Sequence, residues 1–112
     1  MEVSKPTPSL HEAAENGNLE QVEACLRQGT DINKRDRDKM TALHYAAFNG
    51  HKNVVALLLE KGAELDAKGQ DGGVPALHMA ATRGHKDICK LLIEKGADLH
   101  AEDRYGRTPI HY

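Results

Sequence analysis

The sequence has few of the large aromatic residues that usually anchor a compact core. Among 112 residues there are no Trp, one Phe and three Tyr. Apolar residues still make up 39% of the chain and charged residues 29%, a balance typical of a folded chain and not of a disordered one. Burial must therefore come from Ala, Leu, Ile and Val. This composition favours many small, similar contacts over one central core.

The charge balance, the short apolar runs and the two cysteines each exclude a class of protein. Fifteen basic and seventeen acidic residues are mixed along the chain, so no basic block predicts nucleic-acid binding. The longest apolar stretches, such as residues 54–59, are too short to cross a bilayer, and residues 1–6 lack the apolar segment of a secretory signal. Two cysteines cannot build a disulfide framework. We therefore expect no membrane association and a reducing compartment, cytoplasmic or nuclear.

The sequence repeats itself at intervals of 33 or 34 residues. The histidine markers are His11, His44, His78 and His111. Two sets of glycines keep the same spacing: Gly17, Gly50 and Gly84, and then Gly29, Gly62 and Gly96. The neighbours match as well, because residues 10–14, 43–47 and 77–81 all read Leu-His-x-Ala-Ala. Three concurrent registers indicate an array of repeated structural units.

Each unit predicts two short helices followed by a polar connection. Residues 42–49 and 52–61 carry apolar side chains at helical spacing, and each segment ends before a glycine, Gly50 or Gly62. Thr41 stands where a hydroxyl would cap the first helix. Helices of this length are not stable alone in water. They must stack, so that each unit buries its apolar face on the next.

Two segments resemble the Thr-Pro-Leu-His-x-Ala signature of ankyrin repeats: residues 41–47 (Thr-Ala-Leu-His-Tyr-Ala-Ala) and residues 108–111 (Thr-Pro-Ile-His). The resemblance extends from residue 8 to residue 112. It implies an all-α solenoid of helix-turn-helix pairs with protruding β-hairpin or turn connections, and a concave face lined by those connections and the first helices. The expected units are an N-terminal tail 1–7, repeat 1 at 8–35 as the N-terminal cap, repeat 2 at 36–68, repeat 3 at 69–102 and an incomplete repeat 4 at 103–112.

Several positions depart from the ankyrin pattern. Lys39 stands where the family usually has Gly at the tip of the connection, which disfavours a glycine-type turn. Repeat 3 has one extra residue within 69–76 and no Thr before His78, so its Thr–His pairing is lost. The sequence stops at Tyr112, early in a first helix. We therefore expect three residues of the last full unit to need a cover, from further sequence, a partner or end-to-end self-association: Leu91, Leu92 and Ile93.

The histidines and cysteines do not predict a reactive site. The four marker histidines lie one repeat apart, too far for a zinc ion whose ligands lie about 2 Å from it. We expect each to bond backbone or Thr near its own helix start, and we expect His51 and His85, which follow the glycine that ends a helix, to bridge turn to helix. Cys25 and Cys89 fall at apolar positions of second helices, which predicts buried, unreactive thiols. No His-Glu-x-x-His or phosphate-binding loop occurs. We expect no catalytic residue, no metal and no cofactor, and hence no enzyme activity.

The candidate binding residues are those that change from unit to unit, because in the resembled family these positions form the binding surface. At the connections they are Arg37, Asp38, Met40, Gln70, Asp71, Arg104, Tyr105 and Arg107. On the first helices they are Tyr45, Phe48, Asn49, Met79, Thr82 and Arg83. Exposed apolar side chains beside arginines are typical of binding hot spots, although Phe48 and Met79 could instead pack between repeats. Repeat 1 places acidic residues on the same face, so the groove should grade from acidic to basic.

The resemblance also implies what the chain does. The leading hypothesis is a scaffold or adaptor that binds a partner protein. The alternatives are the substrate-recruiting segment of a larger enzyme, or a stoichiometric inhibitor of a kinase or transcription factor. In the family, one position near the end of each repeat is a target of an asparaginyl hydroxylase. Its counterparts here are Asn33, Asp66 and His100.

Overall fold

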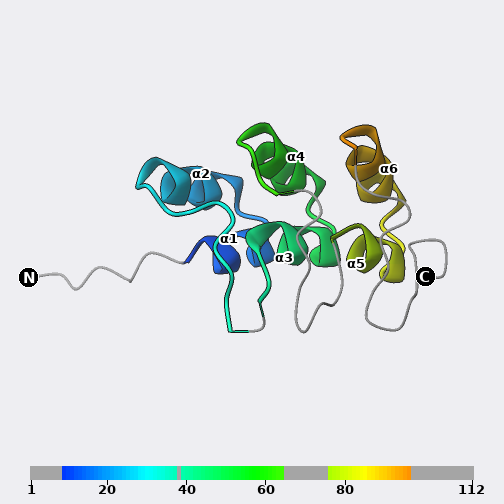
Figure 1. Ribbon diagram of the computed structural model, residues 1–112, viewed down its shortest axis with the longest axis horizontal. Coiled ribbons are helices and arrows are strands. Elements are labelled where there is room, and N and C mark those ends of the chain that lie inside the picture. Colours follow the sequence, from blue (N-terminus) through cyan, green and yellow to red (C-terminus); the bar gives the residue numbers. More distant parts are fainter. Residues whose placement is uncertain (1–8, 38, 65–75, 97–112) are drawn as a thin grey trace, which may run out of the picture.

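Six short helices in two layers make up the part of the chain that the computed structural model describes, residues 9–37, 39–64 and 76–96. They are α1 (Leu10–Asn16), α2 (Leu19–Arg27), α3 (Ala42–Asn49), α4 (Lys52–Glu60), α5 (Ala76–Thr82) and α6 (Lys86–Glu94). The first helices α1, α3 and α5 form one row, and α2, α4 and α6 form a second row beside it (Figure 1). No strand occurs within these ranges. The predicted all-α solenoid is confirmed.

The helix ends follow from the capping residues. The Thr41 hydroxyl accepts a hydrogen bond from the His44 amide, while the His44 ring accepts one from the Thr41 amide, which forms a capping box at the start of α3. Gly50 ends the helix in the left-handed conformation, with φ of 80°. The predicted helix at 42–49 is confirmed, and the one at 52–61 ends one residue earlier, at Glu60.

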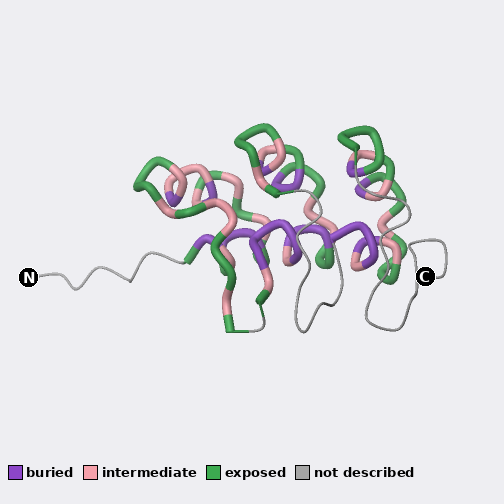
Figure 2. Tube along the Cα trace, in the orientation of Figure 1, coloured by how far each residue is buried: buried purple, intermediate pink, exposed green. Residues whose placement is uncertain are grey.

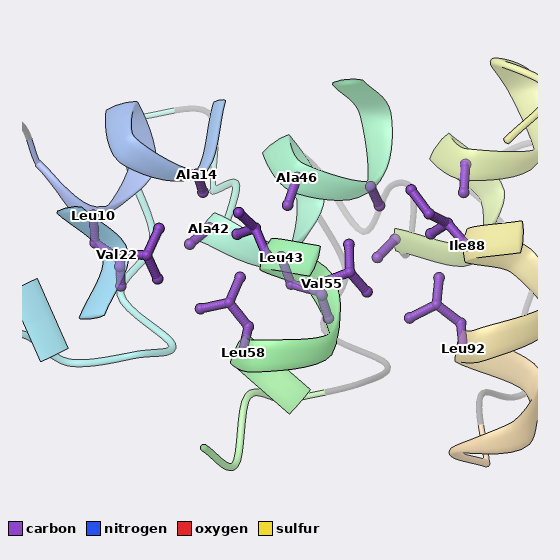
Figure 3. Packing of buried hydrophobic residues seen from close by; sticks show 14 of the residues in the cluster. Leu10, Ala14, Val22, Ala42, Leu43, Ala46, Val55, Leu58, Ile88 and Leu92 are labelled. Carbon is purple, nitrogen blue, oxygen red and sulfur yellow. The ribbon is translucent and has the colours of Figure 1, made fainter. Parts of the chain in front are cut away.

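The core is one continuous band of small and branched side chains between the two rows. Figure 2 shows the buried residues along α1, α3 and α5 and on the inner sides of α2, α4 and α6. In Figure 3, Leu43 of the first row and Val55 and Leu58 of the second row converge in the middle repeat. Ala46, which is fully buried, lets neighbouring first helices approach closely. Each buried Leu or Val contributes about 1.5–3 kcal/mol, so many equivalent contacts hold the array together.

At the last described helix, the predicted need for a cover is wrong for most of the residues concerned. Leu92 is fully buried and Leu91 is half-buried against the core, while Ile93 is 43% exposed. The helical phase explains the difference, because successive residues of α6 are turned about 100° from each other. Only the side chain at position 93 therefore remains exposed among these three.

The connection between α2 and α3 reverses at Lys39, whose φ is 61°. A left-handed conformation at a non-glycine residue costs about 1–2 kcal/mol. The chain therefore keeps a glycine-type turn here despite the side chain, contrary to the expectation from sequence. The Lys39 amide donates to the Asp36 carbonyl at 2.9 Å, and the Asp36 amide donates to the Met40 carbonyl at 3.0 Å. These bonds close the turn.

Candidate functional site

The variable positions of the first helices lie together on one exposed face. Since α1 packs on α3 and α3 on α5, equivalent positions of the three helices are neighbours. Most of these side chains are exposed, whereas Tyr45 of α3 and Met79 of α5 are half-buried. We call this set the first-helix face: Glu12, Glu15, Asn16, Tyr45, Phe48, Asn49, Met79, Thr82 and Arg83.

Phe48 and Arg83 form the centre of the first-helix face. The Phe48 ring is 37% exposed although it is a large apolar side chain. The Arg83 guanidinium carbon lies 5.1 Å from the centre of that ring, so a cation from α5 covers an aromatic ring from α3. At an exposed site such a contact contributes about 0.5–1 kcal/mol. The structure thus places Phe48 outside the core, whereas Met79 is half-buried.

The half-buried Tyr45 side chain makes contacts within the chain. Its hydroxyl donates a hydrogen bond to the Asp36 carboxylate, and its ring meets the His11 ring edge-on, with centroids 5.8 Å apart. His11 Nε2 in turn lies 2.8 Å from the Lys34 carbonyl and 3.0 Å from the Met40 carbonyl. Tyr45 and His11 therefore hold the connection between α2 and α3 against the first helices. Sequence reasoning missed this role.

His51 and His85 connect each repeat to the preceding one. His51 Nε2 donates to the Glu15 carbonyl at 2.8 Å, and His85 Nε2 donates to the Phe48 carbonyl at 2.9 Å. Each ring thus bridges a turn to a helix, as expected, and the helix it reaches is the first helix of the preceding repeat. Repeat 1 has Asn18 at the equivalent position, where no described repeat precedes it. A histidine at this position in repeats 2 and 3, but not in repeat 1, was the feature of the sequence that could have indicated a contact with the preceding repeat.

The two ring contacts require glycine at the turns they reach. A Cβ at Gly17 would lie 2.5 Å from His51 Nδ1, and a Cβ at Gly50 would lie 2.8 Å from His85 Cε1. Both glycines also have positive φ, 72° and 80°. Gly17 and Gly50 therefore allow both the left-handed turn and the close approach of a histidine ring. As a result, the backbone carbonyls of Glu15 and Phe48 on the first-helix face are held in place.

The comparison with known families agrees with this architecture. A family model described as "Ankyrin repeats (3 copies)" matches residues 10–103 and 69–112. The chain belongs to the ankyrin-repeat family. Ankyrin repeats are protein-binding modules and typically have no catalytic role. No curated protein matches this chain.

The described marker histidines of the ankyrin array have structural roles. His44 Nδ1 lies 2.8 Å from the Thr41 hydroxyl, so the predicted bond near the helix start is present in repeat 2. His11 differs, because it bonds the following connection. His78 is fully buried in α5. Within the described ranges, no group of three or more His, Cys, Asp or Glu side chains is placed to hold a metal ion.

The two thiols differ in exposure. Cys25 is buried in α2, as predicted, whereas Cys89 of α6 is only partly buried. Both are free. Burial raises the pKa of the Cys89 thiol above its usual value, an effect that a hydrogen bond from its own backbone partly offsets. A raised pKa reduces the thiolate fraction and hence the nucleophilicity of this residue.

The remaining predicted residues of the ankyrin connections are only partly described. Arg37 is exposed, and Met40 is half-buried with its amide donating to Asp36 Oδ1 at 3.0 Å. Asn33 is half-buried, and its Oδ1 accepts a hydrogen bond from the Glu64 amide at 2.7 Å, which ties the first connection to the next. The others lie outside the described residues: Asp38, Asp66, Gln70, Asp71, His100, Arg104, Tyr105 and Arg107.

No helix in the described part of the array is long and apolar enough to cross a membrane.

Proposed function

We propose that this chain is a scaffold or adaptor of the cytoplasm or nucleus that binds a partner protein on its first-helix face and performs no chemistry itself. The observation that carries the proposal is the exposed Phe48 ring with the Arg83 guanidinium stacked on it. Aromatic and arginine side chains at the centre of a face contribute most of the binding energy in protein interfaces.

The rigidity of this face supports the same proposal. The Phe48 carbonyl is held by His85 and the Glu15 carbonyl by His51, so neighbouring first helices keep a constant register. A surface that is already ordered loses little conformational entropy when a partner binds. The variable side chains therefore stand on a backbone that does not need to rearrange.

The test is a comparison of two double variants in affinity capture from cell lysate. Phe48→Ala with Arg83→Ala removes the centre of the first-helix face. Asn53→Ala with Lys90→Ala changes two exposed residues of the second helices and serves as the matched control. We leave Tyr45 unchanged because it holds the connection through Asp36. Circular dichroism checks that both variants stay folded.

The proposal expects the face variant to lose partners that the wild type and the control variant both retain. Equal recovery by all three proteins would mean that binding uses another surface. Stoichiometric addition of the chain to a captured kinase or transcription factor separates an adaptor, which leaves activity unchanged, from an inhibitor.

A further inference from the structure

The charges of the first-helix face are ordered along the array. On α1 the exposed residues include Glu12 and Glu15, on α3 the central exposed residue is Phe48, and on α5 it is Arg83. The sequence of charge from repeat 1 to repeat 3 is thus negative, neutral and positive. Since the three helices pack side by side, this order is a property of one continuous surface.

No ion pair within the described part of the chain uses these charges, although Arg83 stacks on Phe48. The ion pair found there joins Arg35 and Glu64, 4.0 Å apart, and involves neither the α1 carboxylates nor Arg83. On α3, which lies between α1 and α5, the Asn49 side chain already donates a hydrogen bond to the Tyr45 carbonyl at 3.0 Å. The two ends of the face therefore carry the charges that remain for a ligand.

The neighbouring connection between α2 and α3 carries charges of both signs, with an excess of basic residues. From residue 34 to residue 39 the sequence reads Lys-Arg-Asp-Arg-Asp-Lys, four basic residues and two acidic ones. Arg35 lies near Glu64, and Asp36 accepts the bond from Tyr45. The order from negative to positive charge is thus found along the exposed residues of the first helices and not along this connection.

From this order we infer that the face binds an extended segment of a partner protein with a basic side chain over α1, an apolar side chain over Phe48 and an acidic side chain over Arg83. The inference rests on the proposed function and names the chemistry of the ligand. A carboxylate can pair with the edge of the Arg83 guanidinium while the plane of that group stays on the Phe48 ring.

Helix spacing sets the distance between the two charges of the ligand. Packed helices lie about 8–10 Å apart, so α1 and α5 are separated by about 16–20 Å. An extended chain advances about 3.3 Å per residue. The basic and acidic side chains of the ligand should therefore lie about five or six residues apart, with the apolar anchor between them.

The experiment starts from random twelve-residue peptides displayed and selected on the folded chain, with the enriched peptides synthesised and labelled for anisotropy titration. We expect enrichment of one basic and one acidic residue about five or six positions apart. For such a peptide, Arg83→Glu should weaken binding about fivefold, because it removes an exposed ion pair and replaces it with repulsion between two carboxylates. Lys90→Glu on α6 makes the matched change of charge away from the face.

Compensating changes assign each charge to its helix. Changing the acidic residue of the peptide to Lys should restore binding to Arg83→Glu, and changing its basic residue to Glu should not. For Glu15→Lys, changing the basic residue of the peptide to Glu should restore binding, and changing its acidic residue to Lys should not. Lys90→Glu should bind like the wild type throughout. Higher salt should reduce all of these differences, because exposed charges are screened.

The outcomes separate this inference from the proposed function. Peptides that lose binding to Phe48→Ala but show no charge order, or no compensation with Arg83→Glu, overturn the inference and leave the face as the binding surface. Peptides that bind Phe48→Ala as tightly as the wild type place the binding surface elsewhere and overturn both. Failure to enrich any peptide also counts against both, because a preformed face should select ligands from such a library.

Discussion

Replacing Gly17 with alanine should destabilise the array more than the same replacement at Gly84. The two glycines occupy equivalent turns and have nearly equal φ values, 72° and 74°. They differ in surroundings, because a Cβ at Gly17 would lie 2.5 Å from His51 Nδ1, whereas no described atom lies within 4 Å of a Cβ at Gly84. The pair therefore separates the cost of the left-handed turn from the cost of the collision.

The magnitudes follow from these two terms. An alanine in the left-handed conformation costs about 1–2 kcal/mol at either site. Overpacking against the His51 ring adds about 1–3 kcal/mol at Gly17 alone. If the ring is displaced instead, its bond to the Glu15 carbonyl is lost, at about 1 kcal/mol. Gly17→Ala should thus lower the free energy of unfolding by about 2–5 kcal/mol and Gly84→Ala by about 1–2 kcal/mol.

Urea denaturation followed by circular dichroism measures the difference. A second arm combines Gly17→Ala with His51→Ala, which removes the ring that the new methyl group would meet. In the His51→Ala background, Gly17→Ala should lower the free energy of unfolding by only as much as Gly84→Ala does in the wild type. Equal costs at Gly17 and Gly84, or an unchanged cost after removal of the ring, would refute the role assigned to the His51 contact.

Three further predictions concern single residues. Leu58→Ala should lower the free energy of unfolding by about 2–5 kcal/mol because Leu58 is fully buried, whereas Leu59→Ala, at a half-buried position of the same helix, should cost clearly less; urea titration of both variants checks the order. Lys39→Gly should stabilise the chain by about 0.5–1 kcal/mol, because it relieves the positive φ of 61° although it frees the unfolded chain, and a lower midpoint than wild type would contradict this. Cys89 should react slowly with a thiol reagent at pH 8 and faster as the pH rises, because burial raises its pKa; a rate in the native chain equal to that in urea would contradict this.

The repeat array could be predicted from the sequence because its signals are local and recur. The period of the histidines and glycines indicated the units, and Thr41 and Gly50 marked the ends of α3. The apolar positions at helical spacing indicated the core, including the fully buried Leu58. Each of these features depends on contacts within one unit or on identical contacts in the next.

The features that the sequence did not reveal depend on contacts between separate elements, which the repeating signals do not report. His51 reaches the Glu15 carbonyl, 36 residues earlier, and only the stacking of the repeats brings the two together. Tyr45 was expected to face a partner, yet its hydroxyl bonds Asp36 in the connection before it. The left-handed Lys39 shows that the turn is determined by its surroundings, since the residue itself disfavours that conformation.

The central claim is that the exposed, variable residues of the first helices recognise the partner. Its most direct test is nuclear magnetic resonance of the isotope-labelled chain during titration with a captured partner or selected peptide. The account predicts that chemical-shift changes concentrate at Phe48, Asn49, Thr82 and Arg83. Changes concentrated on the outer sides of α2, α4 and α6, with these four residues unaffected, would contradict it.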